Sequence, residues 1–532
     1  MKMLNRLPQP LKGDFEERKY QLNIFNEVKD HNSLVVLPTA LGKTMIAVFL
    51  VAEKIEKSDG HIFFLAPSKP LCEQHAETLR EHLDAEVLVV TGETHGPDER
   101  SEAWKVGRIT VATPQTVWND IREGRIDLGD CPLIVFDEAH RATGDYAYVP
   151  ICRHYLDNST CSQVLGLTAS PGNDLDRLAE VALNLGIKKV SVRTEGSEDV
   201  KPYVGEKELE RIEVKKTEFI TKGEKTLNRI LEDFIGDLSK YSRKARGLDP
   251  QKASPKVLKE VMGELQTRLQ RSKKGYLYHA VSLCSAAMKL IHLKGLLTTQ
   301  GLEVAREFMQ NLEEEDTRAS SLFLNRDEAK KLRKLMDGMD SSKNPKLGNV
   351  IDVLQRHFCS RPRGRAMVFA EYRDTVDFLT KKLNEYPNMA AEKFIGQAGS
   401  EGMSQKEQKE ILERFDKGEF DILVSTSIGE EGIDVPSTSL VVFYEPVPSA
   451  IRRIQRKGRT ARDGRKGEIK VLVMEDTRDE PYYWKSLRGE KKMYKEAYRL
   501  KKTLEESPNP VEKLRSLITS EQVGLDKWSA GN

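Results

Sequence analysis

The stretch from Val35 to Thr44 places the strongest constraint on how this chain folds. Three apolar residues come first, and Gly42-Lys43-Thr44 stands directly before a long apolar run, residues 45–52. This pattern predicts a buried strand, a tight loop and the start of a helix. A loop in that position aims backbone N–H groups at a phosphate, and the helix dipole assists it. The sequence therefore predicts a phosphate site in the first part of the chain.

Two side chains of this stretch have expected roles. Lys43 would reach the β- and γ-phosphates of a nucleotide, and Thr44 would place its hydroxyl on Mg²⁺. The general pattern asks for glycine at Leu37, so only its Gly-Lys-Thr part is present. Such a short match also arises by chance, and the rest of the chain has to decide. We expect the loop itself to consist of Pro38, Thr39, Ala40, Leu41 and Gly42.

Composition limits the class of protein. A chain of 532 residues is too long for one hydrophobic core, so several domains are expected. Its 38% hydrophobic and 32% charged residues indicate a soluble globular protein, and its net charge of +2 means that any nucleic-acid site is a local patch. The six cysteines form no CxxC pair, which favours the cytoplasm over a zinc or disulfide framework. We find neither a signal peptide nor an apolar run of the ~20 residues of a membrane span.

The residues before the loop predict a helix with one buried face, because apolar side chains recur there at spacings of three and four. At the start of this helix, Gln21 offers both a donor and an acceptor, the pair that an adenine edge requires. We therefore place Arg18 and Gln21 in the nucleotide site. An ordinary surface glutamine at a helix start is the alternative.

Apolar runs alternate with helical stretches through the first part of the chain. The runs occupy residues 62–66, 87–90, 109–112, 133–136 and 164–167. Strands that alternate with helices form a parallel sheet, and ligands bind at the carboxyl ends of its strands. Hydroxyl and amide groups there suit nucleic-acid phosphates, although ordinary turn chemistry is the alternative for each. The residues at such ends are Thr91, Thr113, Gln115, Thr168 and Ser170.

The second strong pattern is residues 133–140, where four apolar residues lead directly into Asp137 and Glu138. Two adjacent carboxylates after a buried strand are costly unless a cation or a substrate compensates them. Asp137 would hold Mg²⁺ through water, and Glu138 would orient the attacking water. His140 would connect this site to the rest of the molecule. A solvated acidic turn is the alternative.

From about residue 206 to 340, strand patterns become rare and long charged helical stretches take over. Residues 240–274 are rich in lysine and arginine with few acids, and Tyr276 and Tyr278 follow directly. A basic helical surface with aromatic residues nearby suits a nucleic-acid backbone. A solvated charged face is the alternative, and composition alone does not decide between the two.

A second alternation of strands and helices begins near Asn344. Its apolar runs are residues 366–370, 421–425 and 440–444. Thr426 and Gly429 follow the middle run, and we expect them to contact nucleic acid at the strand end. We assign Asp434, slightly further along, to the nucleotide site.

Gln455, Arg459 and Arg462 form the last pattern. The two arginines are three residues apart, which places them on one face of a helix. Two planar cations in that arrangement can clamp a γ-phosphate while charge spreads in the transition state. We predict catalytic roles for all three residues, with a basic surface helix as the alternative.

The patterns together resemble motifs I, II, III and VI of superfamily 2 helicases. The chain resembles the helicase part of the archaeal Hef-type proteins, and it is also similar to the Fanconi anaemia M-type translocases and the RIG-I-like RNA translocases. Residues 394–408 are typical of the Hef branch. One departure is Ala40, where motif I usually has glycine, the one residue that is free at positive φ.

The resemblance implies an α/β protein with two RecA-like parallel-sheet domains and an all-helical insertion between them. ATP would sit in the cleft, with Lys43, Thr44, Asp137 and Glu138 on one wall and the two arginines on the other. The domains that we expect are residues 1–205 (first RecA-like domain), 206–342 (helical, thumb-like insertion in contact with nucleic acid), 343–480 (second RecA-like domain) and 481–532 (charged helical tail).

The expected activity is that of an ATP- and Mg²⁺-dependent DNA helicase or translocase, acting on branched or forked DNA in repair and replication-fork restart. A nuclease or a replication clamp is the expected protein partner, and no membrane is involved. We find no Glu-Arg-Lys-x-x-x-Asp motif, so we expect no nuclease site in these residues.

Two other functions stay open. A duplex-RNA translocase of the RIG-I-like kind shares all the motifs, so they do not distinguish it from a DNA motor. An ATP-gated clamp that binds forks without productive unwinding belongs to another class, and intact Glu138, Arg459 and Arg462 argue against it.

Overall fold

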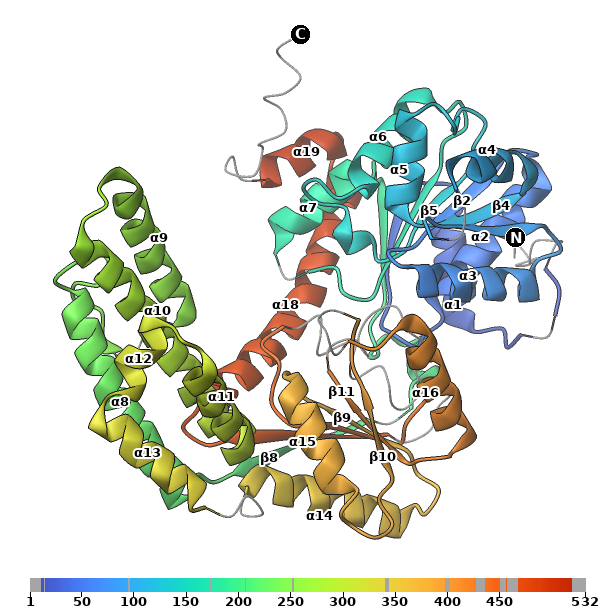
Figure 1. Cartoon of the computed structure of the whole chain (residues 1–532). Coiled ribbons are helices and arrows are strands. Elements are labelled where there is room, and N and C mark those ends of the chain that lie inside the picture. The colour runs from blue at the N-terminus through green and yellow to red at the C-terminus, as the bar shows by residue number, and fades with distance from the viewer. Residues whose placement is uncertain are drawn as a thin grey trace.

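The structure is a computed structural model of the whole chain. It describes residues 11–13, 15–93, 96–172, 174–205, 207–250, 253–339, 344–397, 402–426, 436–449, 456 and 467–518. Figure 1 shows three parts, which are two α/β units and a helical part at the side of the second.

A seven-stranded parallel sheet forms the first unit, in the order β3-β4-β2-β5-β6-β1-β7. Its strands are β1 (Ser33–Val36), β2 (Ile62–Leu65), β3 (Val87–Val90), β4 (Ile109–Ala112), β5 (Ile134–Phe136), β6 (Val164–Thr168) and β7 (Lys189–Val192). Five of them, β1, β2, β4, β5 and β6, are buried along their whole length, as short apolar runs predict for a sheet covered on both faces.

Helices cover both faces of this sheet. They are α1 (Lys19–Val28), α2 (Lys43–Lys57), α3 (Lys69–His82), α4 (Pro97–Val106), α5 (Pro114–Arg122), α6 (Tyr148–Asn158) and α7 (Leu175–Asn184), with short turns η1 (Ala139–Arg141) and η2 (Lys201–Tyr203). The helices α1, α2 and α3 share one hydrophobic core with one face, and α5, α6 and α7 share another with the opposite face. Both cores depend on the alternation of strands and helices that the sequence predicts.

The helical part consists of α8 (Glu218–Leu238), α9 (Pro255–Arg271), α10 (Gly275–Gly295), η4 (Leu296–Gln300), α11 (Leu302–Glu314), α12 (Arg318–Leu324) and α13 (Asp327–Asp337). Hydroxyl side chains cap three of these helices, since Thr217, Ser254 and Thr317 each accept a hydrogen bond from the first turn. The core of this part is continuous with one face of the second sheet.

A six-stranded parallel sheet forms the second unit, in the order β10-β11-β9-β12-β13-β8. Its elements are β8 (Lys207–Val214), α14 (Pro345–Ser360), β9 (Ala366–Phe369), α15 (Arg373–Leu383), β10 (Ala391–Phe394), α16 (Gln405–Lys417), β11 (Ile422–Ser425), β12 (Leu440–Phe443) and β13 (Gly467–Met474). The predicted fold class, two parallel-sheet α/β units with helices between them, is confirmed.

One segment differs from the expectation. We expected residues 207–214 at the start of the helical insertion, but they form β8, which pairs with β13 along its full length at the edge of the second sheet. Edge strands carry charged side chains that protect them from pairing with other chains. The sequence Lys-Glu-Leu-Glu-Arg-Ile-Glu-Val therefore shows no apolar run that would mark it as a strand.

The C-terminal helices α18 (Asp479–Glu506) and α19 (Pro510–Leu517) return to the first unit. Figure 1 shows α18 running from the second unit to the first, where it contacts β7 and α7. Buried side chains of α18 and α19 complete the core on that face.

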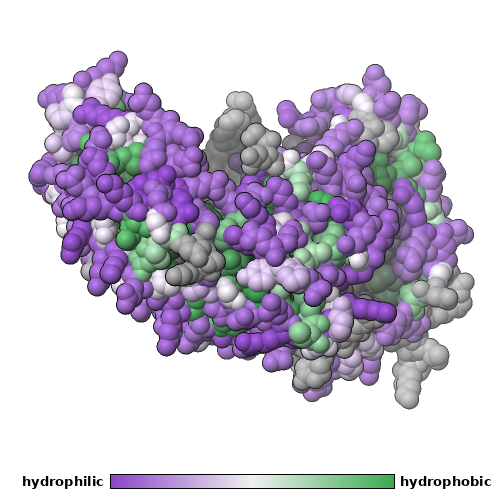
Figure 2. Space-filling view, turned by 60° about the horizontal axis from the view of Figure 1, so that its bottom comes forward, coloured by the Kyte–Doolittle hydropathy of each residue, from purple (hydrophilic) through white to green (hydrophobic). Residues whose placement is uncertain are grey.

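One helical stretch in the described part, Gly275–Gln300, is long and apolar enough to cross a membrane, and 50% of its most apolar window is buried inside the protein. The sequence analysis did not single it out. It forms the centre of the helical part, where α10 packs against α8, α9 and α12, and core helices pass the same test of length and composition. Elsewhere the surface is charged, and Figure 2 shows a mostly hydrophilic face with hydrophobic side chains in small groups.

Candidate functional site

The loop between β1 and α2 has the geometry of a phosphate-binding loop. It leaves the sheet beside β6, where the Leu37 N–H donates to the Thr168 carbonyl over 3.1 Å. Gly42 has φ 64° and ψ 49°, and α2 begins at the next residue, so the first N–H groups of α2 face the loop. Ala40 also has a positive φ, 65°. The departure from glycine at this position therefore leaves the loop geometry intact, at a cost of about 1–2 kcal/mol in backbone strain.

Two side chains of α1 hold this loop from the side. The Tyr20 hydroxyl donates to the Leu41 carbonyl over 2.7 Å, and the Gln21 amide donates to the carbonyls of Leu41 and Gly42, each over 3.3 Å. A Cβ on Gly42 would lie 2.6 Å from the Gln21 amide nitrogen and would displace the end of that flexible side chain, while the backbone angles of Gly42 favour glycine. Contact between Gln21 and a base stays a prediction, and here its donor group supports the loop.

Arg18 lies just before α1. Its guanidinium forms an ion pair with Glu16 over 3.0 Å and stands 5.9 Å from the centre of the Tyr203 ring. The Tyr203 ring in turn meets Tyr20 edge to face at 5.3 Å. Arg18 is therefore linked to the phosphate loop through the rings of Tyr203 and Tyr20, and Gln21 contacts that loop directly through two hydrogen bonds. Their assignment to one nucleotide site stays a prediction.

The carboxylate pair after β5 faces this loop across β6, which lies between β5 and β1. The Tyr148 hydroxyl donates to the Asp137 carbonyl over 2.7 Å, which fixes the backbone at the strand end. Glu138 follows with φ 47° and ψ 48°, a left-handed conformation that is rare for a residue with a side chain. Such strain persists where the surrounding structure holds it, and it is common at active sites.

Glu138 lies among positive charges. Its carboxylate is 3.6 Å from the Lys43 ammonium and 3.2 Å from His140 Nδ1, and His140 Nδ1 is also 3.0 Å from the Thr168 hydroxyl. Burial alone would raise the pKa of Glu138, but the charges of Lys43, His140 and Arg141 and the hydrogen bond from His140 outweigh it and lower that pKa. The carboxylate is therefore ionised and can accept a hydrogen bond from an attacking water.

His75, on α3, connects the two predicted metal ligands, and the sequence analysis missed it. Its Nε2 lies 2.8 Å from Asp137 Oδ2, and its Nδ1 lies 3.4 Å from the Thr44 hydroxyl. The sequence does contain a signal, because His75 is a polar residue spaced three and four positions from Cys72 and Leu79 on the buried face of α3.

The donor set of this site fits Mg²⁺. Thr44 and Asp137 offer one hydroxyl and one carboxylate, and Mg²⁺ binds to few protein oxygens while substrate phosphates supply others. Among the described residues, no group of three or more His, Cys, Asp or Glu side chains could hold a metal ion, so a cage made of protein ligands alone is not found in that part. The ion would thus be shared between Thr44, Asp137 and a bound nucleotide.

The residues predicted to bind nucleic acid divide by exposure. Gln115 is exposed at the start of α5, and Thr113, partly buried, shares a hydrogen bond of 2.8 Å with the Thr116 hydroxyl. The other described members of the set are buried, namely Thr91, Thr168, Ser170 and Thr426. Thr168 contacts His140 beside the nucleotide site. Contact of these residues with nucleic acid stays a prediction, and in this conformation the exposed Gln115 is best placed for it.

Several predicted residues lie outside the described residues. They are Gly429, Asp434, Gln455, Arg459 and Arg462. Their neighbour Arg456 is described, and its buried guanidinium stacks over Phe369 and Phe443 at 4.8 and 5.8 Å from the ring centres. These two rings belong to β9 and β12, so Arg456 itself packs on the second sheet.

The basic stretch 240–274 lies on the helical part, and internal ion pairs use some of its charge. Lys244 pairs with Glu260 and Arg268 with Glu264, each over 3.6 Å. Tyr276 and Tyr278 are exposed, and the Tyr276 ring stacks on Tyr241 at 6.1 Å. Exposed rings beside the lysines and arginines of this stretch keep the features of a nucleic-acid surface.

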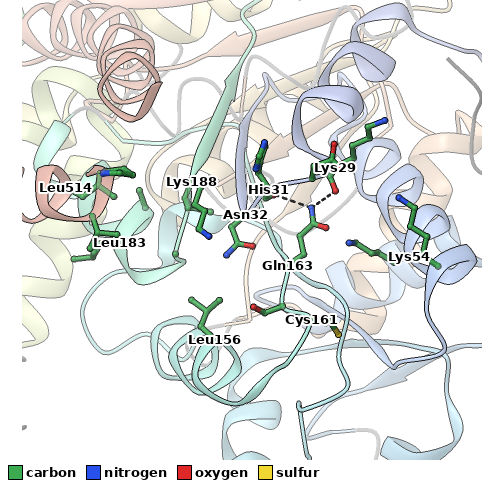
Figure 3. Close-up of a pocket in the computed structure, with 18 residues that line it drawn as sticks. Lys29, His31, Asn32, Lys54, Leu156, Cys161, Gln163, Leu183, Lys188 and Leu514 are labelled. Carbon is green, nitrogen blue, oxygen red and sulfur yellow. Dashed lines mark hydrogen bonds between the residues drawn. The ribbon is translucent and has the colours of Figure 1, made fainter. Parts of the chain in front are cut away.

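A pocket of about 650 Å³ lies at the amino ends of the strands of the first sheet. Figure 3 shows the residues that line it. Asn32, Gln163 and Lys188 each precede a strand there, and Lys29 and Lys54 also line it. The helices α1, α2 and α7 end at this edge, so lysines compensate the partial negative charge of their last carbonyls. The Gln163 amide donates to the carbonyls of Val28, Lys29 and His31. This pocket is therefore separate from the phosphate loop, which lies at the carboxyl ends of the strands.

Two protein-family models match the chain. A DEAD/DEAH box helicase model covers residues 18–178, and a helicase conserved C-terminal domain model covers residues 346–464. The first range contains the phosphate loop and the carboxylate pair, and the second contains most of the second sheet.

Known proteins and structures agree with these models. The crystal structure of the Pyrococcus furiosus Hef helicase domain superposes with a TM-score of 0.69 at 39% identity, covering 88% of this chain and 98% of that domain. A provisionally named ATP-dependent RNA helicase of Methanocaldococcus jannaschii is 40% identical over 90% of this chain. The ATP-dependent DNA helicase mph1 of Neurospora crassa is 33% identical over 87% of it. The chain spans 60% and 41% of the lengths of these two relatives.

Proposed function

The chain belongs to the Hef-type helicases of superfamily 2 and is an ATP-hydrolysing helicase, and from this premise we propose that it is a DNA motor acting on branched or forked DNA. The observation that carries the proposal is the ionised Glu138 carboxylate, held by Lys43 and His140 beside the phosphate loop. A clamp without turnover has no need of a carboxylate in a strained backbone position next to the phosphates.

In this proposal, each predicted nucleotide-site residue of the first unit has one task. Lys43 leaves Glu138 and binds the β- and γ-phosphates when ATP enters, and Glu138 then orients the attacking water. Thr44 and Asp137 would hold Mg²⁺, which would neutralise charge on the phosphates. Arg459 and Arg462 complete the site from the second unit, so that hydrolysis depends on closure of the cleft between the units. We propose that Gln455 acts together with these two arginines.

The nucleic acid would lie across both units and along the helical part. Gln115 and Thr113 offer groups that contact phosphates without reading sequence. The exposed Tyr276 and Tyr278 offer stacking surfaces beside the basic stretch 240–274. Phosphate contacts of this kind make binding strongly dependent on salt. A role in repair and fork restart, with a nuclease or a replication clamp as partner, is part of the proposal.

The test measures ATP hydrolysis with Mg²⁺ in the presence of forked DNA, linear duplex DNA, duplex RNA or no nucleic acid. We expect forked DNA to stimulate hydrolysis most, and Glu138→Gln to abolish the stimulation. Glu53→Gln is the matched control, because Glu53 is a buried carboxylate on α2 that pairs with Lys57 over 2.7 Å, away from the loop.

An RNA-dependent activity is the second candidate, because one relative carries the name of an RNA helicase. Stimulation by duplex RNA alone would favour it and contradict the DNA proposal. Tight binding to every nucleic acid without hydrolysis would contradict both motors and favour the clamp.

A further inference from the structure

We propose that His75 is a positioning residue of the magnesium site, which turns the Thr44 hydroxyl and the Asp137 carboxylate so that their free lone pairs face the ion. The inference rests on the proposed function, because it assigns a task within the same site.

The ring of His75 is held firmly. It is buried on α3 and lies 4.5 Å from the ring of Phe64, which belongs to β2. Its two nitrogens each lie within hydrogen-bond reach of one predicted ligand, with 2.8 Å to Asp137 Oδ2 and 3.4 Å to the Thr44 hydroxyl. The second distance is long for a hydrogen bond, and such contacts in ligand-free active sites often shorten on binding.

The polarity of these contacts follows from the groups themselves. An ionised carboxylate only accepts hydrogen bonds, so the tautomer of His75 that fits this contact carries its proton on Nε2 and donates to Asp137. Nδ1 is then an acceptor, and the Thr44 hydroxyl donates to it. A hydroxyl that donates its hydrogen to Nδ1 keeps both lone pairs of its oxygen available for a cation. Asp137 uses Oδ2 in its contact with His75, so Oδ1 is also available for the cation.

Outer-shell contacts of this kind determine metal affinity. Removing a group that orients a ligand costs typically 10- to 100-fold in metal affinity. His75 orients two ligands at once, one from the loop after β1 and one from the end of β5. It therefore also fixes the distance between two segments that are far apart in the sequence.

His82 provides a matched control on the same helix. It is also buried, two helical turns after His75, and it meets Phe15 edge to face at 5.8 Å. Its nearest carboxylate is that of its exposed neighbour Glu81, at 4.0 Å. Replacing His82 therefore disturbs α3 packing to a similar degree without touching Thr44 or Asp137.

The experiment compares wild type with His75→Phe, His75→Gln, His75→Asn and His82→Phe. Phenylalanine keeps the ring and removes both hydrogen bonds. The glutamine amide reaches about as far as Nε2, and the asparagine amide about as far as Nδ1, so each retains one contact. Binding of a fluorescent ADP analogue is measured during a Mg²⁺ titration and again in EDTA, alongside the thermal midpoint of each variant.

We expect the Mg²⁺ concentration at half-maximal binding to rise roughly 10- to 100-fold in His75→Phe and less in the other two His75 variants. Binding of the ADP analogue in EDTA should be the same in all variants. The His82→Phe variant should keep the wild-type midpoint of the Mg²⁺ titration. A folded His75→Phe with a wild-type Mg²⁺ midpoint would overturn the inference while leaving the proposed function intact. If His75→Phe does not fold, unchanged midpoints in both amide variants would overturn it. A wild-type protein whose nucleotide binding ignores Mg²⁺ would refute the proposed magnesium site as well.

Discussion

The contact between Lys43 and Glu138 predicts that Glu138→Gln binds ATP more tightly than wild type while hydrolysing it far more slowly. The two charges are 3.6 Å apart and mostly buried. ATP needs the same ammonium for its phosphates, so in wild type part of the binding free energy is used to separate Lys43 from Glu138. Glutamine removes the charge, keeps the shape and releases Lys43.

The size of the effect follows from the geometry. Two unit charges at this distance attract each other by roughly 4–5 kcal/mol at an effective dielectric constant of about 20. Desolvation of both groups offsets most of that attraction, which leaves a net value on the order of 1 kcal/mol. Every 1.4 kcal/mol is a factor of ten, so we expect the Kd for ATP to fall about fivefold. Loss of the water-orienting group should lower kcat by about 10²- to 10⁴-fold.

The assay determines the Kd of an ATP analogue by fluorescence titration and kcat by phosphate release, with Mg²⁺ and forked DNA present. Glu53→Gln serves as control and should change neither value. Weaker ATP binding in Glu138→Gln would refute the reasoning, because it would mean that Glu138 helps to hold the nucleotide or the loop instead of competing for Lys43.

Three further predictions concern the loop and the second unit. Gly42→Ala should cost about 1–2 kcal/mol through its left-handed backbone and displace the Gln21 amide from the loop carbonyls, so faster amide exchange in the loop is expected and unchanged exchange would contradict it. Ala40→Gly should relieve strain and stabilise by about 0.5–1 kcal/mol; a lower thermal midpoint would show that the loop is not strained there. Burial raises the pKa of Glu445 from 4.5 to about 7. The folded state therefore keeps that proton more tightly, and stability falls as pH rises from about 4.5 to 7. Glu445→Gln should stabilise by on the order of 3 kcal/mol at pH 8 and by nothing at pH 4; equal effects at both pH values would contradict this.

The parts of the site that sequence predicts are those encoded by neighbouring residues. The loop up to Lys43 and the carboxylates Asp137 and Glu138 each follow a short apolar strand, and a buried strand followed by charge is a local pattern. The same reasoning identifies the central strands of both sheets, because those strands are buried along their whole length. Ala40 shows how far such a pattern reaches, since the loop keeps its path there with φ 65° although the side chain is unfavourable.

The parts that sequence missed depend on contacts between distant segments. His75 is 31 residues from Thr44 and 62 from Asp137, and only the fold brings the three together. β8 becomes a strand by pairing with β13, more than 250 residues later, while its own residues are those of a charged edge. Gln21 has the chemistry of a base reader, yet here its donor supports carbonyls of the loop, and no local pattern could reveal that.

The helix α18 connects the phosphate loop to the second sheet. A buried ion pair holds its first end, and apolar contacts hold its last turns. At its start, Asp479 accepts a hydrogen bond of 2.6 Å from Lys346, and both side chains are at most 2% exposed. Separating such a pair leaves an uncompensated buried charge, at a cost of about 3–5 kcal/mol.

Further along, α18 passes the phosphate loop, because Glu490 and Tyr494 share a small pocket with Pro38 and Thr39. Its last turns, with Leu500 and Leu504, pack on the first sheet through apolar contacts, which have no directional requirement. If the two sheets move relative to each other, we expect the first end to stay fixed and the apolar end to slide. Because α18 passes the predicted phosphate loop between these two ends, we expect such a movement to change the position of that loop.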